Sequence, residues 1–324
     1  MRRLFALLAL AALLVPLPLS VPFARPAAAR AETAQPAPPG FNLLTRPSSA
    51  TPAGDGVSFE GRAVLLAMQR AYPLRVEDVS WRDGDWAIRV DEQWFFWTGG
   101  RLLPARERDE IERYDPIPFY RYEPGPLAVP EYSAEERAAL GARADEIDRD
   151  PPRRHPGFMN AIWRITDRST SWQRQKTTFF LGMKTMVHRD LLEDLAAVEE
   201  AIMAAARNDA ALRAFIAGLR TVEGYNFRRV DGTASLSNHS YGVAVDLLPA
   251  SYGGRQVYWR WARDGGVDWL GLSLRERYSI PQPIVDAFER YGFVWGGKWS
   301  FFDTIHFEYR PEILILNGHE VELR

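Results

Sequence analysis

The 324-residue sequence contains no cysteine, and this absence excludes several kinds of site. Without thiols there is no disulfide scaffold, no cysteine nucleophile, no thiolate-bound metal and no lipid attached through an N-terminal cysteine. Histidine is also scarce, with 5 residues in the chain. Any bound metal must therefore be held by histidine, aspartate or glutamate side chains.

The sequence also lacks the excess of basic residues that nucleic-acid binding normally needs. Its 40 lysines and arginines are balanced by 42 aspartates and glutamates, which leaves a formal net charge of -2. Proteins bind phosphate backbones through clustered lysines and arginines, and no basic stripe is present. We therefore expect no nucleic-acid partner. The apolar content, 46% of the residues, is sufficient for a sizeable core.

Residues 1–31 have the pattern of a signal peptide. Two arginines precede an apolar run from Leu4 to Val21, and small residues follow, with cleavage expected near Ala29 or Ala31. A membrane anchor is the alternative, but prolines interrupt a run that is already marginal for crossing a ~30 Å hydrocarbon core. The sequence predicts export by the Sec or the twin-arginine route, to the periplasm or to the cell wall outside. We expect no stable membrane span after cleavage.

The rest of the chain divides into three predicted segments. Residues 32–55 are rich in proline, alanine, serine and threonine, which is typical of a flexible leader. Residues 56–130 are predicted to form a small β-rich accessory subdomain, and residues 131–324 the main domain. The boundary follows a proline-rich stretch and precedes a capping box, Ser133 with Glu136, that opens a helix.

The predicted accessory subdomain begins with a helical pattern at residues 61–72. Short aromatic runs then follow between Val79 and Gly100, separated by Asp-Gly and Gly-Gly, and they indicate a β-meander. The region contains four tryptophans: Trp81, Trp86, Trp94 and Trp97. Aromatic residues at strand spacing usually fill a core, although these rings could instead form a carbohydrate platform.

The main domain changes character along its length. Helical periodicity is present at residues 190–207 and 211–219, and short strands with glycine turns follow Thr221. Helices followed by a compact sheet indicate the α+β class. We expect helices packed on a small antiparallel sheet, preceded by the β-rich subdomain.

Two of the five histidines, His239 and His306, stand in unusual sequence surroundings. Residues 243–248 have the composition of a buried strand yet contain Asp246, and a buried carboxylate is costly unless it is paired or bound to metal. In the second segment, His306 and Glu308 point to one face of a predicted strand. Two imidazoles and one carboxylate suit zinc and leave its fourth position open, but the spacing alone also fits hydrogen-bonded structural histidines. The other three are expected at the surface (His155 and His319) or in packing or capping (His188).

Two motifs together resemble the signature of the D-alanyl-D-alanine carboxypeptidase family of zinc peptidases. The first is Ser-x-His-x-x-Gly-x-Ala-x-Asp, from Ser237 to Asp246, and the second is Asp-x-x-His-Phe-Glu, from Asp303 to Glu308. The family includes vancomycin-resistance carboxypeptidases and dipeptidases, and phage L-alanyl-D-glutamate endopeptidases. The resemblance covers residues 179–311 and leaves the N-terminal subdomain outside it.

The resemblance implies a role for each residue of the two motifs. His239, Asp246 and His306 would be the zinc ligands, and Asp303 would be the general base. Zinc lowers the pKa of a bound water to ~7, so a nearby carboxylate suffices to take its proton. Glu308 would orient one of the ligands by hydrogen bonding.

The family also places an arginine upstream of the first histidine, where it stabilises the developing oxyanion. Arg228 and Arg229 are the candidates in this sequence. If Tyr225 and Phe227 face the core from a strand, Arg228 faces the cleft, so we assign the role to Arg228. Four further residues are predicted to line the substrate groove: Ser237, Tyr241, Trp295 and Trp299. For the two tryptophans a structural role is the alternative.

These features predict an exported zinc-dependent peptidase that hydrolyses peptidoglycan stem peptides by means of an activated water. It would act as a D-alanyl-D-alanine carboxypeptidase or as an L-alanyl-D-glutamate endopeptidase. One alternative is a non-catalytic module that binds cell-wall peptides, and the presence of Asp303 with all three ligands argues against it. The other is a zinc hydrolase of ordinary peptides.

Overall fold

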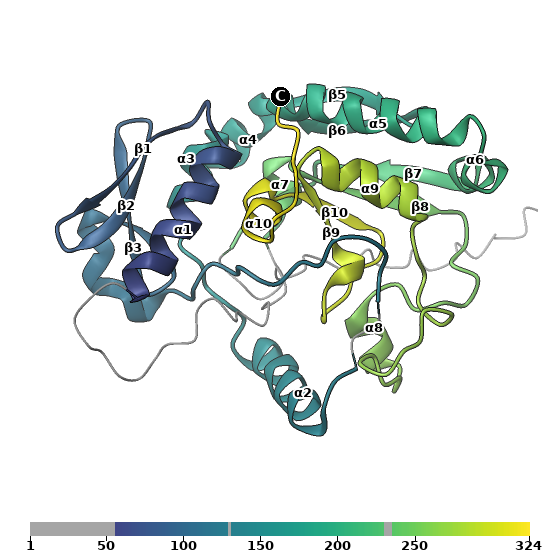
Figure 1. Cartoon of the computed structure of the whole chain (residues 1–324), viewed down its shortest axis with the longest axis horizontal. Coiled ribbons are helices and arrows are strands. Elements are labelled where there is room, and N and C mark those ends of the chain that lie inside the picture. Colours follow the sequence, from purple (N-terminus) through teal and green to yellow (C-terminus); the bar gives the residue numbers. More distant parts are fainter. Residues whose placement is uncertain (1–55, 129–130, 230–234) are drawn as a thin grey trace, which may run out of the picture. The chain divides into compact units, whose positions relative to one another are not determined.

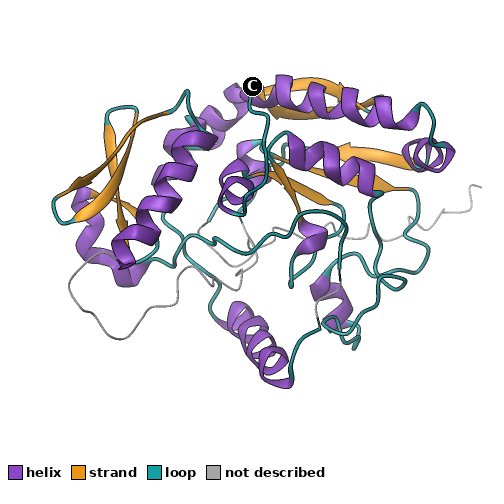
Figure 2. Ribbon diagram, in the orientation of Figure 1, coloured by secondary structure: helices purple, strands orange, loops and turns teal. Residues whose placement is uncertain are grey.

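A computed structural model describes residues 56–128, 131–229 and 235–324 (Figures 1 and 2). The predicted signal peptide and flexible leader, residues 1–55, lie outside the described residues. The described elements combine helices with small antiparallel sheets, which confirms the predicted α+β class. None of the helices in these ranges is both long enough and apolar enough to cross a membrane.

The N-terminal elements are a helix and an antiparallel meander. They are α1 (Gly56–Ala71), β1 (Val76–Arg82), β2 (Asp85–Val90), β3 (Gln93–Thr98), β4 (Arg101–Pro104) and the 3-10 helix η1 (Ala105–Arg113). The strands pair in the order β1-β2-β3-β4, which confirms the predicted meander. The turn after β1 uses Gly84 at φ +86°, a left-handed conformation that glycine adopts at little cost.

The four tryptophans of the meander do not share one environment. Trp97 is 6% exposed and belongs to the core, as the predicted core role requires. Trp81, near the end of the edge strand β1, is 54% exposed, and its ring meets that of Trp86 edge to face at 5.8 Å. Trp86 and Trp94 are half-buried. The core role therefore holds fully for Trp97 alone among the four.

The proline-rich stretch before residue 130 packs against the rest of the protein instead of separating two domains. Tyr122 is 1% exposed. Its hydroxyl donates a hydrogen bond to Glu289 Oε1 at 2.6 Å and accepts one from the Trp295 N–H at 2.8 Å. One cluster of buried apolar side chains includes residues from both sides of position 130. The segment predicted as an accessory subdomain thus shares its hydrophobic core with the main domain.

The middle of the chain supplies helices and a hairpin. The elements are α2 (Ala134–Arg149), α3 (Gly157–Trp163), α4 (Arg168–Arg174), β5 (Gln175–Phe180), β6 (Met183–His188), η2 (Arg189–Leu191), α5 (Leu192–Ala206) and α6 (Ala210–Ala217). The predicted capping box opens α2. The Ser133 side chain accepts a hydrogen bond from the Glu136 N–H at 3.2 Å, and the Glu136 carboxylate accepts one from the Ser133 N–H at 2.8 Å.

A second antiparallel sheet, in the order β7-β8-β10-β9, occupies the C-terminal part of the chain (Figure 1). The elements here are β7 (Leu219–Glu223), α7 (Asn238–Tyr241), β8 (Ala244–Pro249), α8 (Trp259–Asp264), α9 (Gln282–Arg290), β9 (Phe293–Trp295), η3 (Gly296–Lys298), β10 (His306–Tyr309) and α10 (Pro311–Leu316). Helix α9 packs on this sheet, where the rings of Phe288 and Phe307 stack with centroids 4.0 Å apart. Burial of each ring contributes about 1.5–3 kcal/mol, so the centre of β10 is firmly held.

His188, at the end of β6, has the capping role expected from the sequence. Its Nδ1 accepts a hydrogen bond from the Asp190 N–H at 3.2 Å, and its Nε2 donates one to the Trp163 carbonyl at 3.1 Å. The neutral ring is thus satisfied at both nitrogens. Burial lowers the pKa of His188 to about 4, although the nearby Asp190 carboxylate acts in the opposite direction.

This buried histidine makes stability depend on pH. Between pH ~6.5, the value in an unfolded chain, and the folded-state pKa of about 4, the unfolded state binds a proton that the folded state does not. The contribution of neutral His188 should therefore be complete at pH 7 and fall by about 1.4 kcal/mol per pH unit as the pH drops through this window. We predict that His188→Gln is less stable than the wild type at pH 7, and that the gap narrows by about 2 kcal/mol at pH 5. Urea unfolding of both metal-free proteins measures this, and a gap independent of pH would contradict it.

Candidate metal centre

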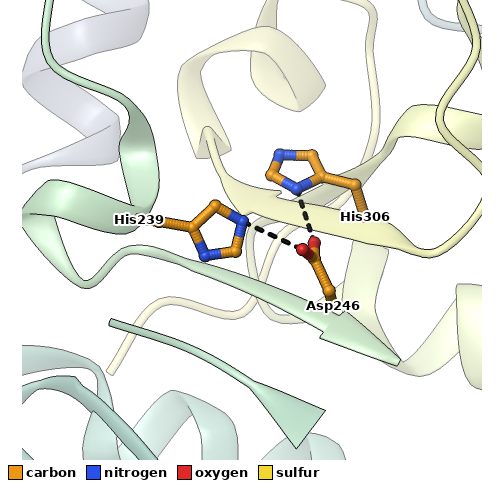
Figure 3. A group of neighbouring side chains, drawn as sticks. All are labelled: His239, Asp246 and His306. Carbon is orange, nitrogen blue, oxygen red and sulfur yellow. Dashed lines mark hydrogen bonds and ion pairs between the residues drawn. The ribbon is translucent and has the colours of Figure 1, made fainter. Parts of the chain in front are cut away.

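The second sheet brings Asp246 and His306 side by side. Asp246 lies in β8 and His306 opens β10, and the two residues are direct partners in the antiparallel register. His239 comes from the short helix α7, just before β8, and its ring reaches the same carboxylate (Figure 3). One nitrogen or oxygen atom from each of the three side chains lies within 4.8 Å of the others. The three predicted ligands are therefore brought together.

Both ends of helix α7 are fixed by local contacts. The Ser237 side chain accepts a hydrogen bond from the His239 N–H at 3.3 Å and so caps the first turn. Gly242 ends the helix at φ +73°, and a Cβ at this position would lie 1.9 Å from Gln175 Oε1. Only glycine fits such a backbone and such a close neighbour. The glycine of the first motif therefore serves to position His239.

The hydrogen bonds of His239 determine which of its nitrogens faces the site. Nδ1 lies 2.6 Å from the Gly224 carbonyl oxygen, and because a carbonyl only accepts, Nδ1 carries the proton. Nε2 then carries a lone pair. This atom is buried without a hydrogen-bond partner among the described residues, and it lies 3.3 Å from Asp246 Oδ2. A lone pair that faces a carboxylate oxygen indicates a place for a cation between them.

His306 presents its other nitrogen to the same carboxylate. Its Nε2 donates to Glu308 Oε2 at 3.3 Å, and its Nδ1 lies 2.8 Å from Asp246 Oδ1. Glu308 therefore holds the His306 ring through a hydrogen bond. Burial lowers the pKa of His306, but the hydrogen bonds to Asp246 and Glu308 outweigh it and raise the value to about 10. Without a metal, a proton thus occupies the position between His306 and Asp246.

The donor set fits zinc. Two imidazole nitrogens and one carboxylate oxygen are common zinc ligands, and three protein ligands leave a position for water or substrate. Burial raises the pKa of Asp246, but the neighbouring His239 and His306 outweigh it and hold the pKa well below its usual range. The carboxylate is therefore ionised and available as a ligand. His239, Asp246 and His306 would hold the metal.

Asp303 lies close to this cluster but outside it. The side chain is 9% exposed, and its Oδ1 accepts a hydrogen bond from the Ile305 N–H at 3.3 Å. Burial, followed by the negative charge of Asp246, raises the pKa of Asp303 to about 7, while His306 and Arg228 act in the opposite direction. A carboxyl group with such a pKa takes up and releases protons near neutral pH.

Arg228 and Arg229 lie in different environments. Arg228 is half-buried and its positive charge acts on Asp303, whereas Arg229 is exposed. The predicted strand alternation is wrong, because β7 ends at Glu223 and the segment that follows is irregular. The backbone of Arg228 is held instead by Ser240, whose hydroxyl accepts from the Arg228 N–H at 2.7 Å and donates to its carbonyl.

The four residues predicted to line a substrate groove are buried, with exposed fractions of 1–6%. Ser237 caps α7, and the Tyr241 hydroxyl donates to Asn160 Oδ1 at 2.8 Å. Trp295 donates from Nε1 to the Thr304 carbonyl at 2.8 Å and stacks against Phe307. Trp299 contacts the ring of His306, with centroids 5.7 Å apart. These placements correct the prediction of a groove lining, because each side chain is used in supporting the cluster.

Sequence reasoning missed several residues that surround the site. Tyr252 follows β8, and its pKa is raised by burial and then by the negative charges of Asp303 and Asp246. Asn238 donates from Nδ2 to Glu308 Oε2 at 2.5 Å. Arg310 Nη1 lies 3.6 Å from Glu308 Oε1. Asn238 and Arg310 adjoin the two motifs and could have been found there, whereas nothing in the local sequence marks Tyr252.

A line of buried polar contacts connects this site to the N-terminal helix. From Glu308 it passes to Arg310, whose Nε donates to Glu312 Oε1. The Tyr72 hydroxyl, at the C-terminal end of α1, donates to Glu312 Oε2 at 2.8 Å. Glu308, Arg310 and Glu312 are each no more than 5% exposed. Truncation of any member would leave a buried charge without its partner.

One known family matches the part of the chain that contains both motifs. Residues 231–309 match the family model described as D-alanyl-D-alanine carboxypeptidase. The match contains the three clustered residues together with Asp303 and Glu308, and Arg228 lies outside it. It is shorter than the resemblance inferred from the sequence, and it supports a peptidase.

The N-terminal segment has a match of its own. Residues 64–119 match a family model described as a domain of unknown function, DUF8518. This range contains the whole meander and the second half of α1. No solved structure matches the chain significantly.

We predict that the purified protein binds one zinc ion per chain, and that His239→Ala and His306→Ala each remove most of it. Each substitution deletes one of three protein ligands, so the affinity should fall by at least ~10²-fold. Metal analysis after dialysis against a weak chelator measures this. His155→Ala is the matched control, because His155 pairs with Glu107 at 2.9 Å and takes no part in the cluster. Full zinc content in both His239→Ala and His306→Ala would contradict the assignment.

Proposed function

We propose that this protein is an exported zinc-dependent peptidase that hydrolyses the stem peptides of peptidoglycan. The observation that carries the proposal is the buried, unpartnered Nε2 of His239, which faces Asp246 beside the Nδ1 of His306. The family match over the same residues supports a peptide as substrate. Export is proposed from the signal-peptide pattern, because the wall lies outside the membrane.

The chain itself would hold the metal and move the proton. His239, Asp246 and His306 hold the zinc, and Glu308 holds the ring of His306 through Nε2. Bound zinc supplies a Lewis acid that polarises the scissile carbonyl and acidifies water. Asp303 accepts the proton of the attacking water on its carboxylate while the new C–O bond forms. The same carboxyl group returns the proton to the amide nitrogen as the C–N bond breaks.

Arg228 would act on the carbonyl oxygen. As water attacks, negative charge grows on this oxygen, and a guanidinium group stabilises it more in the transition state than in the bound substrate. The buried Nε of Arg228 has no hydrogen-bond partner among the described residues, so the group retains a free donor. The half-buried position beside Asp303 supports this assignment.

Digestion of purified muropeptides by the zinc-loaded protein tests the proposal. Mass spectrometry of the products is expected to show loss of a terminal D-alanine or cleavage between L-alanine and D-glutamate. We predict that Asp303→Asn retains zinc and lowers turnover by ~10²-fold or more, because it removes proton transfer and no ligand. Binding of muropeptides without cleavage by the wild type would favour the non-catalytic alternative. Equal cleavage of ordinary L-peptides would favour the general hydrolase.

We predict a kinetic difference between the two neighbouring arginines. Arg228→Ala should lower turnover by ~10²-fold with zinc content unchanged, because it removes the donor to the developing oxyanion. Arg229→Ala is the matched control and should retain most activity, since its side chain is exposed. Kinetic assays of both zinc-loaded variants measure this. Loss of turnover in Arg229→Ala but not in Arg228→Ala would reverse the assignment.

A further inference from the structure

A pocket outside the metal cluster is lined by side chains that the proposed mechanism does not use. It has a volume of about 460 Å³ and is lined by Arg168, Trp172, Met186, Tyr225, Asn226 and Phe227. These residues come from α4, from β6 and from the irregular segment that follows Gly224. Trp172 is 60% exposed, so its ring does not serve the core.

Two walls of this pocket are hydrogen-bonded directly to the helix that carries His239. The segment after Gly224 is one wall, where the Asn226 N–H donates to the His239 carbonyl at 3.1 Å. Helix α4 is the other, where the Ser171 hydroxyl donates to the Ser240 carbonyl at 2.5 Å. The pocket therefore lies beside the metal centre, with α7 in contact with both.

The chemistry of the lining is aromatic with one positive charge. The rings of Trp172 and Tyr225 lie 6.0 Å apart, and the Arg168 guanidinium lies over the Phe227 ring at 6.0 Å. No aspartate or glutamate lines the pocket. Among the described residues, no carboxylate forms an ion pair with Arg168, whose side chain is exposed. An exposed guanidinium group next to aromatic rings can bind a carboxylate that is attached to an apolar carbon chain.

The charge of the surrounding sequence favours an anionic ligand. Residues 163–190, which contain α4 and the β5–β6 hairpin, include 6 lysines and arginines and 2 aspartates, although the whole chain has a net charge of -2. Such a local excess attracts anions toward the pocket. Nucleic acid does not fit this pocket, since a single guanidinium among the lining residues cannot follow a phosphate backbone.

We propose that this pocket is a substrate subsite that binds a carboxylate-bearing residue of the peptide near the bond that is cut. The inference rests on the proposed peptidase function and specifies its substrate class as acidic peptides. Arg168 pairs with the carboxylate, and the Trp172, Tyr225 and Phe227 rings contact the carbon chain that carries it. The carboxylate belongs to the C-terminus of the peptide or to a side chain, which share this chemistry.

Matched peptides test the subsite. Three substrates are needed: a stem peptide with free carboxylates, the same peptide amidated at its C-terminus, and the same peptide amidated at its side-chain carboxylates. The wild type should have the lowest KM for the peptide with free carboxylates. The amidation that raises KM identifies the carboxylate that Arg168 binds. Arg168→Gln should raise KM for the preferred acid by about tenfold, with kcat and zinc content unchanged, because one charged hydrogen bond is lost.

Two further variants show whether the effect of Arg168→Gln comes from carboxylate binding. One tests the loss of any exposed arginine, and the other tests apolar contact with the peptide. Arg275→Gln is the matched control, since Arg275 is exposed and lies outside the pocket, and it should behave as the wild type. Trp172→Ala should weaken the binding of the acid and the amidated peptides alike by about tenfold, because the ring contacts the carbon chain in both. If Trp172→Ala weakens binding and Arg168→Gln has no effect, the ligand group is uncharged and the proposal is overturned.

Calorimetry with the same peptides distinguishes failure of the subsite from failure of the proposed function. If the protein cuts no peptide, the proposed function fails, and tighter binding of the free acid that disappears in Arg168→Gln still supports the subsite. If the protein cuts peptides and Arg168→Gln affects acid and amidated substrates equally, the function stands and the subsite is overturned. Absence of any difference between acid and amidated peptides in both assays also overturns it.

Discussion

The site depends on one constraint, the placement of the Asp246 carboxylate between two imidazoles whose outer nitrogens are already engaged. The Gly224 carbonyl oxygen accepts a hydrogen bond from His239 Nδ1, and the Glu308 carboxylate accepts one from His306 Nε2. The inner nitrogens then face ionised oxygen atoms in a buried place. Such an arrangement is costly unless a cation or a proton lies between them, so the surrounding structure favours a positive charge at this place.

The same constraint explains why the N-terminal helix belongs to the site. Glu308 is buried and needs a positive partner, and Arg310 provides it. Arg310 in turn contacts Glu312, which accepts a hydrogen bond from Tyr72, the residue that directly follows α1. The segment that matches a domain of unknown function thus completes the polar contacts behind His306. Its shared core with the C-terminal sheet is consistent with that arrangement, because rigid support keeps the ligands in place.

Much of the local structure could be predicted, since it depends on neighbours in sequence. The meander followed from turn glycines and aromatic runs, and the capping box from the Ser133 and Glu136 spacing. The strand predicted for the Arg228 segment is wrong, because β7 ends at Glu223 and the next residue, Gly224, packs so closely on β6 that a Cβ would lie 2.2 Å from the Met186 carbonyl oxygen. The contacts of the proline-rich stretch before residue 130 could not be predicted, because Tyr122 has its partner Glu289 far away in sequence, which no local pattern records.

The sequence by itself determined the chemistry available to this protein. With no cysteine, any metal site was limited to histidine and carboxylate side chains, and the resemblance of two motifs to a family of zinc peptidases singled out His239, Asp246 and His306. Only the tertiary structure decided which nitrogen of each imidazole faces the site, that Ser237, Tyr241, Trp295 and Trp299 are supports, and that the pocket of Trp172 lies beside the cluster. Hydrogen-bond direction, burial and proximity arise from contacts between distant segments, and those contacts exist only once the chain is folded.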